Sequence, residues 1–164
     1  MPILNADSFE FFSHSPEQTR RLGMRLGSLL QSGDFVALSG DLGAGKTTLV
    51  QGIAQGWGSL DAVSSPTFVL VNTYRRSDGF HLHHLDAYRL QSAFEAEDLD
   101  LDTLQEQGAM VVEWPERIDA ALPADRLLIQ LRWIADEQRV MVFSAKGARY
   151  NRLLKEFRQR ILGG

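Results

Sequence analysis

The sequence predicts an α/β fold of three layers, in which helices pack on a mixed central sheet. Helix-like and strand-like segments alternate through the first half of the chain, and strand-like segments dominate the part that follows. Residues 35–38 form a wholly apolar run that leads into a glycine-rich turn and an amphipathic segment. Such a run suits a strand buried on both faces. We therefore expect parallel pairing around the glycine-rich turn and antiparallel pairing toward the C-terminal end.

The first helix is predicted to begin at Pro16. Ser15 suits the N-cap, Pro16 suits the first helical position, and Gln18 stands where a capping box places its polar side chain. A single apolar stripe follows, made of Leu22, Leu26, Leu29 and Leu30. The helix should end near Gly33, just before the apolar strand.

A second helix is expected over residues 46–57, where apolar residues recur on one side and Gly58 follows as a stop. Strands are expected at residues 68–74, 80–85, 109–114, 126–133 and 139–144, with short helical pieces between residues 95 and 107. A last helix is marked by apolar residues between Tyr150 and Ile161. No repeat or long linker interrupts this order, so we expect one domain over residues 1–164.

The composition is that of an average globular protein. The chain has 164 residues, of which 44% are hydrophobic and 23% charged, and it has no cysteine. Disorder is therefore not expected, and disulfide scaffolds, thiolate metal sites and thiol nucleophiles are excluded. The first residues do not resemble a signal peptide, and no window of about 18 apolar residues occurs. We expect a cytoplasmic protein.

Charge is unevenly distributed. Seventeen Lys and Arg against 21 Asp and Glu give a net charge of -4, which argues against a domain devoted to wrapping nucleic-acid phosphates. Any RNA contact must then be local or shared with a partner. Residues 95–102 are acidic, and residues 149–160 are basic. The acidic residues are Glu95, Glu97, Asp98, Asp100 and Asp102, and the basic ones are Arg149, Arg152, Lys155, Arg158 and Arg160. Each run is either an ordinary solvated face or a docking surface.

Residues 40–47 match the pattern G-x-x-x-x-G-K-[ST], between an apolar strand and an amphipathic helix. This context predicts a phosphate-binding loop and, with it, a P-loop NTPase-like form of the three-layer α/β fold. The glycines let successive backbone N–H groups point inward, and the following helix adds its positive dipole end. The predicted cofactor-binding residues of the loop are Leu42, Gly43, Ala44, Gly45, Lys46, Thr47 and Thr48. Lys46 should contact the β and γ phosphates, Thr47 should offer its hydroxyl to Mg²⁺, and Thr48 should contact the α phosphate.

Two acids at strand ends are candidates for magnesium binding and catalysis. Glu113 follows the apolar residues 109–112, and Asp86 follows residues 80–85. We favour Glu113 as the acid on the metal, with Asp86 holding the metal's water shell or orienting the attacking water. Alternatively, both acids cap nearby helices.

Two further features remain open. His81, His83 and His84 are a weak zinc signal because no third ligand shares the face of His81 and His83, so packing or hydrogen bonding within the sheet is favoured. Thr67 follows Ser65 and Pro66 at the start of an expected strand. It is either a switch residue that senses the γ phosphate or part of a strand-initiating turn.

Four motifs in order resemble the TsaE family, bacterial ATPases required for threonylcarbamoyladenosine modification of tRNA. They are GDLGAGKTT at residues 40–48, SPTF at 65–68, HLDAYRL at 84–90 and VEWPER at 112–117. The resemblance implies a P-loop protein with weak ATPase activity alone. It also implies binding to the TsaB and TsaD proteins, with tRNA reached indirectly through that complex. ATP binding and hydrolysis would reset the complex between rounds of transfer to adenosine 37 of tRNAs that read ANN codons.

Carried over to this sequence, the resemblance assigns Lys46 to the phosphates, Thr47 and Glu113 to Mg²⁺, and Thr67 and Asp86 to hydrolysis or switching. Trp114 resembles the family's tryptophan beside the nucleotide, although a core aromatic at a strand end is an equally good interpretation from the residues alone. No Asn-Lys-x-Asp guanine-recognition segment occurs. The preference for ATP rests on the resemblance.

Two other functions fit the same loop. A small-molecule kinase would need an arginine-bearing lid, for which Arg75 and Arg76 are the available residues. A nucleotide-gated binding module would use bound ATP only to organise a docking surface. No arginine is obviously placed as a finger, so we expect slow hydrolysis by the isolated chain.

Overall fold

The computed structural model describes residues 7–41, 43–63 and 71–163. Their strands form one seven-stranded sheet in the order β1-β7-β6-β2-β5-β4-β3. The strands are β1 (Ser8–Ser13), β2 (Phe35–Ser39), β3 (Val71–Arg75), β4 (His81–Asp86), β5 (Gly108–Glu113), β6 (Arg126–Ala135) and β7 (Gln138–Lys146). The α-helices are α1 (Pro16–Gly27), α2 (Lys46–Trp57), α3 (Ala93–Glu97), α4 (Leu101–Gln107) and α5 (Ala148–Leu162). Two short 3-10 helices, Pro115–Arg117 and Asp119–Ala121, follow β5.

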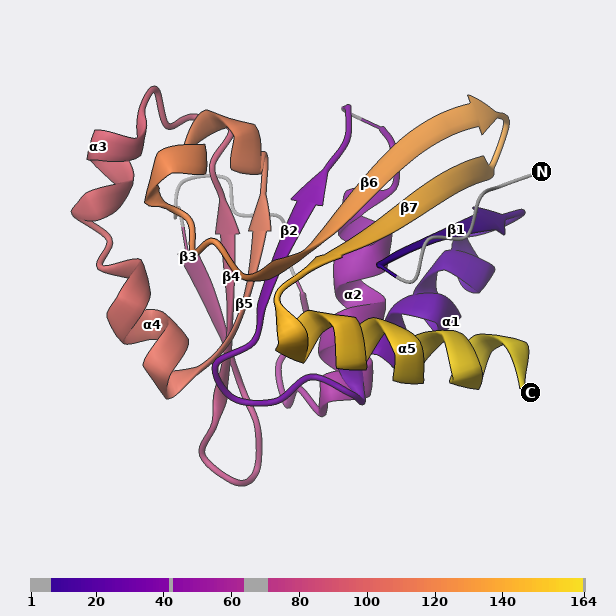
Figure 1. Ribbon diagram of the computed structural model, residues 1–164, viewed down its shortest axis with the longest axis horizontal. Helices are drawn as coiled ribbons and strands as arrows, with labels where there is room; N and C mark the ends of the chain where they lie inside the picture. The colour runs from indigo at the N-terminus through magenta and orange to yellow at the C-terminus, as the bar shows by residue number, and fades with distance from the viewer. Residues whose placement is uncertain (1–6, 42, 64–70, 164) are drawn as a thin grey trace.

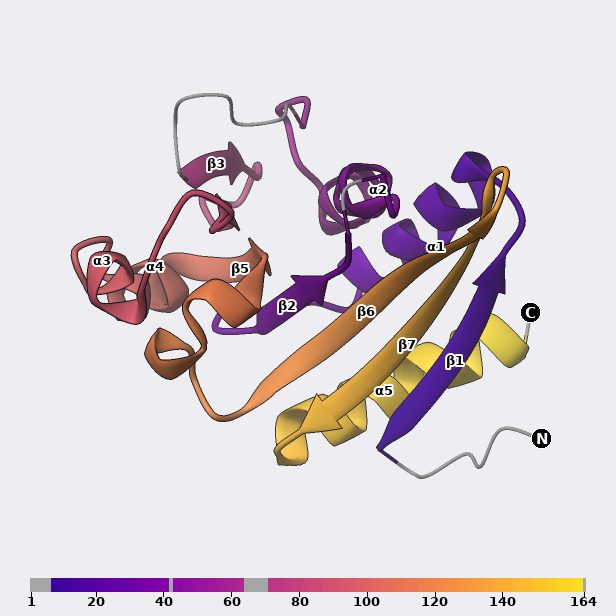
Figure 2. The same cartoon turned by 90° about the horizontal axis from the view of Figure 1, so that it is seen from above.

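The sheet is mixed, as predicted. Strands β4, β5, β2 and β6 pair in parallel, while β3 pairs antiparallel with β4, and β7 pairs antiparallel with β6 and β1. Helices α1 and α2 lie on one face of the sheet and α5 on the other (Figures 1 and 2). Helices α3 and α4 lie at the opposite end of the molecule from α5 (Figure 1). The three-layer α/β prediction is confirmed.

The N-cap predicted for α1 is present, but the capping box is incomplete because Gln18 accepts from the N–H of His14 and not from that of the cap residue Ser15. The side chain of Ser15 accepts a hydrogen bond from the N–H of Gln18 at 3.1 Å, and the side chain of Gln18 accepts one from the N–H of His14 at 2.7 Å. The predicted end of this helix near Gly33 is wrong, because α1 ends at Gly27. Leu29 and Leu30 are still buried, but they lie in tight turns that continue the apolar stripe beyond the helix.

Two features of the strands differ from the sequence prediction. Strand β1 was not expected, yet it pairs with β7 along its whole length, and the burial of Phe9 explains its place in the sheet. The strand expected to reach Trp114 ends at Glu113, since Trp114 has a left-handed backbone conformation with φ of 57°. Of the strand expected at residues 68–74, residues 68–70 lie outside the described residues, and β3 begins at Val71.

Helices α1 and α2 pack at close backbone range because glycines face one another. Gly23 and Gly27 of α1, together with Gly52 and Gly56 of α2, each lie where a Cβ atom would overlap backbone of the opposite helix. This contact holds α2, whose first residue is Lys46, close against α1 on the same face of the sheet (Figure 2). Among the described residues, no helix has the length and apolar character needed to cross a membrane.

Candidate functional site

The glycine-rich loop joins the end of β2 at Ser39 to the start of α2 at Lys46. Gly43 and Gly45 have φ values of 81° and 99°, which side chains other than glycine rarely adopt. At Gly40 a Cβ atom would lie 2.8 Å from the carbonyl oxygen of Leu131 on β6, so glycine is also required by close approach. Leu42, another predicted contact, lies outside the described residues.

The start of α2 presents backbone donors. Its N-cap is Gly45, which provides no capping side chain. No described residue accepts a hydrogen bond from the N–H groups of Thr47 and Thr48. A helix N-terminus with free amides and a positive dipole end is suited to an anion. This geometry fits the phosphate groups that the motif predicts.

Lys46 is buried, with 6% of its surface exposed, and its Nζ donates a hydrogen bond to the carbonyl oxygen of Gly40. The Nζ atom also lies 3.7 Å from the centroid of the Trp114 ring, a cation–π contact. Burial lowers the pKa of Lys46, while the carboxylates of Glu113 and Asp86 act in the opposite direction. A buried ammonium among nearby acids is an environment that a bound polyphosphate would make more favourable for the charge.

Trp114 forms the side of the site next to Lys46. Its left-handed backbone is unusual for a large residue and turns the chain sharply after β5, just before Pro115. The ring contacts that of Tyr88 at a centroid distance of 5.0 Å, and the guanidinium of Arg117 lies 5.3 Å from the Tyr88 centroid. The structure therefore places Trp114 beside the P-loop lysine.

The two predicted acids are neighbours. Asp86 and Glu113 are paired residues at the carboxyl ends of the parallel strands β4 and β5. The carboxylate of Asp86 accepts a hydrogen bond from the N–H of Tyr88 at 3.0 Å, so it also closes a local turn. Glu113 is buried, with 6% of its surface exposed. Both lie at the same sheet edge as the P-loop, since β5 also pairs with β2.

Sequence reasoning did not find the partner of Glu113. The Nε2 of His84 lies 2.5 Å from Oε2 of Glu113, and Nδ1 of His84 lies 3.0 Å from the hydroxyl of Tyr74. The signal was present in the alternation that puts His84 and Asp86 on one face of β4. The sequence does not reveal the register in which β5 pairs with β4, and this register brings Glu113 next to His84.

The histidines form no recognisable metal centre among the described residues, where no group of three His, Cys, Asp or Glu side chains is arranged to hold an ion. The rings of His81 and His83 lie 5.8 Å apart, and Nδ1 of His83 lies 3.0 Å from the hydroxyl of Thr73. This agrees with packing and hydrogen bonding within the sheet. Thr67, the predicted switch residue, lies outside the described residues.

One arginine reaches the loop from an unexpected direction. The Nε of Arg139, on β7, lies 3.7 Å from the position that a Cβ atom of Gly45 would take. Its Nη1 donates to the carbonyl oxygens of Asp136 and Gln138, which hold the side chain near the hairpin. The C-terminal third carries no motif, so nothing in the sequence alone points to this contact.

Four features together define a P-loop-like α/β protein. They are a buried strand, a loop with glycines in left-handed conformations, a buried lysine, and a helix N-terminus whose first amides have no acceptor among the described residues. The family model of the threonylcarbamoyl adenosine biosynthesis protein TsaE matches residues 13–141 of this chain. The chain belongs to the TsaE family.

Individual relatives agree with this assignment. A protein of Bacillus subtilis named tRNA threonylcarbamoyladenosine biosynthesis protein TsaE is 40% identical over 144 residues, which are 87% of this chain and 89% of the relative. A protein of the same name from Streptomyces coelicolor is 46% identical over 137 residues, 80% of this chain and 93% of the relative. The crystal structure of Bacillus subtilis YdiB superimposes with a TM-score of 0.78 at 32% identity, covering 93% of this chain and 95% of that one.

Proposed function

We propose that this chain is an Mg²⁺-dependent ATPase required for threonylcarbamoyladenosine formation at position 37 of tRNAs that read ANN codons. The family and the names of the relatives support a role in this tRNA modification. The observation that carries the ATPase proposal is the position of Lys46. It lies at the N-terminus of α2, within electrostatic reach of the paired strand-end acids Asp86 and Glu113.

The triphosphate would be held by the amides at the start of α2 and by the ammonium of Lys46. Trp114, whose ring already contacts Lys46, would cover one side of the site. The hydroxyl of Thr47 and the carboxylate of Glu113 would hold Mg²⁺, because magnesium prefers oxygen ligands. When bound, the ion supplies charge neutralisation on the phosphates. Asp86 would orient the attacking water.

Resetting a modification complex between rounds requires partner proteins. We propose that the chain acts with the TsaD and TsaB proteins, that tRNA is reached through their complex, and that ATP binding and hydrolysis reset the complex between rounds. Slow hydrolysis by the isolated chain fits a site in which phosphoryl transfer depends on positioning. The kinase alternative receives no support from Arg75 and Arg76, which are paired with Asp61 and Asp78 at 2.8 Å each.

Calorimetric titration with Mg-ATP tests the binding step. The wild-type chain should bind, and Lys46→Ala should lose most of that affinity. The matched control is Lys146→Ala, which removes an exposed lysine on β7 and should leave binding unchanged. Equal affinity of the wild type and Lys46→Ala would refute the assignment.

The variant Glu113→Gln distinguishes an ATPase from a nucleotide-gated binding module that needs only bound ATP. Loss of the carboxylate should lower ATP hydrolysis on the order of 100-fold while ATP binding persists. In a reconstituted reaction with TsaD, TsaB and tRNA, this variant should support a first round of modification and then stall. Full multiple-turnover modification by a variant that cannot hydrolyse ATP would favour the nucleotide-gated module. Appearance of γ phosphate on a metabolite instead of in solution would favour a kinase.

A further inference from the structure

The charge of this chain is polarised between its two ends. Helices α1 and α5 contain eight of the 17 basic residues but only two acidic ones, Glu17 and Glu156. The basic residues are Arg20, Arg21, Arg25, Arg149, Arg152, Lys155, Arg158 and Arg160. The acidic run of residues 95–102 lies in and between α3 and α4, at the other end of the molecule (Figure 1). A net charge of -4 therefore conceals a strongly basic surface.

Not every arginine in these helices is available to a ligand. Arg149 is committed to the buried carboxylate of Asp34 at 2.6 Å. Arg160 makes only a long, exposed contact of 3.5 Å with Glu156. Within the described part of the chain, Arg21, Arg152 and Lys155 form no ion pair, and all three are exposed. These three unpaired cations lie on α5 and the adjoining side of α1, and the exposed Arg89, Arg132 and Lys146 likewise form no ion pair among the described residues.

Two hollows that share Arg25 lie along these two helices, and we treat them together as one groove. Its hollows are lined by Gln18, Arg21 and Arg25 from α1 and by Gln159 and Arg160 from α5, over an apolar floor that includes Leu22. No described lining residue is a carboxylate. The Nη1 of Arg25 donates to the carbonyl oxygen of Arg160 at 2.7 Å, which ties the helices together at this point. We call the surface formed by Gln18, Arg21, Arg25, Gln159 and Arg160 the α1–α5 groove.

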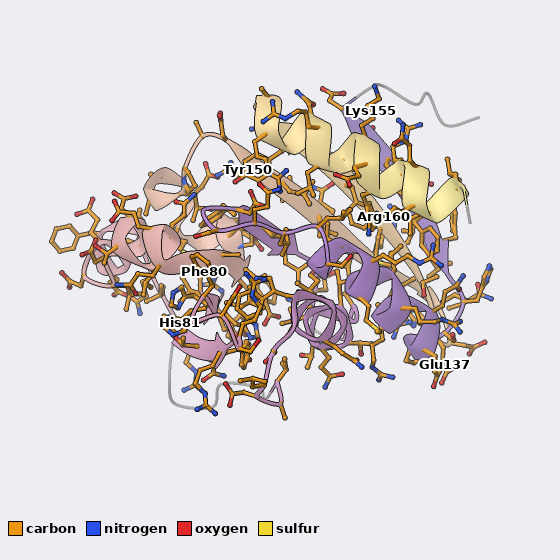
Figure 3. The ribbon with its side chains drawn as sticks, turned by 90° about the horizontal axis from the view of Figure 1, so that it is seen from below. Phe80, His81, Glu137, Tyr150, Lys155 and Arg160 are labelled. Atoms are coloured by element: carbon orange, nitrogen blue, oxygen red, sulfur yellow. The ribbon has the colours of Figure 1, made fainter. Side chains whose placement is uncertain are left out.

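The groove continues onto the outer face of α5. In the view from below, Arg160 lies on the side of α5 that faces α1, and Lys155 lies on the opposite side (Figure 3). Arg152 and Lys155 line a third hollow with Asn151, Arg158, Gln159 and the carboxylate-bearing Asp7. Cations and amides on both sides of one helix give a broad surface of hydrogen-bond donors.

We propose that the α1–α5 groove and the outer face of α5 also bind the phosphate backbone of tRNA directly, in addition to the indirect contact through the TsaD–TsaB complex. This rests on the proposed function for the identity of the RNA. Spaced arginines and amide side chains are the usual donors to nucleic-acid phosphates, and they read shape and charge rather than sequence. The surface is separate from the P-loop, because it is built from α5 and the α1 residues beside it. RNA contact is therefore local in a chain that is acidic overall.

The test is the binding of fluorescently labelled full-length tRNA to the isolated chain, measured by anisotropy without nucleotide at several KCl concentrations. The wild type should bind, with affinity that falls steeply as salt rises. The variant Arg21→Ala/Arg160→Ala should weaken binding on the order of tenfold or more at about 0.1 M KCl. It should also reduce the slope of log affinity against log salt by about 1 for each phosphate that the variant no longer neutralises. Arg25 is left in place because of its bond between the helices.

The matched control is Arg132→Ala/Lys146→Ala, which removes the same charge from exposed residues on β6 and β7 that form no ion pair among the described residues. It should leave both affinity and salt slope close to those of the wild type. Equal weakening by the two double variants would overturn the proposal, since it would show a nonspecific charge effect. Absence of tRNA binding even at low salt, about 25 mM KCl, would overturn it as well.

Competition separates RNA from an acidic protein partner. An unlabelled A-form RNA duplex should displace the tRNA more effectively than polyglutamate of equal total charge. The reverse order would overturn the proposal in favour of an acidic peptide. Mg-ATP binding of the groove variant, measured by calorimetry, should equal that of the wild type. If the wild type shows no heat of Mg-ATP binding, the ATPase proposal fails. The anisotropy measurement of tRNA binding uses no nucleotide, so it still tests the groove.

Discussion

The imidazole of His84 bridges Glu113 and Tyr74. Its Nε2 lies 2.5 Å from a carboxylate oxygen of Glu113, its Nδ1 lies 3.0 Å from the Tyr74 hydroxyl, and all three side chains are buried. The parallel pairing of β4 with β5 creates the contact with Glu113. One oxygen of Glu113 is thereby fixed, which sets the direction in which the carboxylate can meet a ligand. His84 is a positioning residue for the proposed magnesium ligand.

Replacement of His84 should therefore alter the metal dependence of the reaction more than nucleotide binding. We expect His84→Ala to raise the Mg²⁺ concentration needed for half-maximal ATP hydrolysis by about 10-fold to 100-fold, as is usual when the hydrogen-bond partner of a metal ligand is removed. Binding of ATP without Mg²⁺ should change little. His84→Gln, which keeps a hydrogen-bonding side chain, should recover part of the effect. An unchanged Mg²⁺ requirement in His84→Ala would contradict the positioning role.

A methyl group at Gly27 should destabilise the protein. Its Cβ would overlap the carbonyl oxygen of Ile53, and backbone cannot move aside as a side chain can. We expect Gly27→Ala to lower the free energy of unfolding by about 1–3 kcal/mol, measured by urea denaturation. Gln55→Ala, at an exposed residue of α2, should change stability by less than about 0.5 kcal/mol. Equal stability of the two variants would show that α1 and α2 tolerate separation.

The ion pair between Arg149 and Asp34 should be costly to break from one side. Asp34 has 4% of its side chain exposed and accepts from Arg149 at 2.6 Å and from the N–H of Gln31 at 2.7 Å. Arg149→Ala would leave a buried carboxylate without its cation, with an expected loss of about 3 kcal/mol in the free energy of unfolding. The double variant Arg149→Ala/Asp34→Ala should lose less than the sum of the single losses. Simple additivity in this double-mutant cycle would contradict the coupling.

His83 should make stability depend on pH in mildly acidic solution. Burial lowers the pKa of its imidazole, and the nearby His81 adds to the effect. The unfolded chain then binds a proton at a higher pH than the folded chain does. Stability from this residue is full above about pH 6.5, the ordinary pKa of histidine, and falls as pH decreases toward the lowered value.

Urea denaturation at pH values from about 5 to about 8 measures this dependence. His83→Gln should flatten the slope of unfolding free energy against pH below about 6.5. His14→Gln, at an exposed histidine, serves as the control and should retain the wild-type slope. The same slope in the wild type and His83→Gln would rule out His83 as its source.

Local sequence was a good guide wherever structure depends on local physics. The cap at Ser15, the apolar β2 strand and the glycine stop at Gly58 each follow from neighbouring residues, and each is found in the structure. The prediction was wrong where distant packing decided the outcome. Strand β1 forms because β7 offers it a partner, and α1 ends early although Leu29 and Leu30 continue its apolar stripe.

The candidate site divides in the same way. The glycine-rich loop, its lysine and the two strand-end acids could be predicted from the residues alone, because a glycine pattern and a strand boundary are encoded within a few neighbouring residues. Three contacts could be seen only in the folded chain: His84 with Glu113, Arg139 close to Gly45, and the basic hollows of α1 and α5 that share Arg25. These contacts join residues far apart in the chain, and strand register and helix packing determine which of them meet.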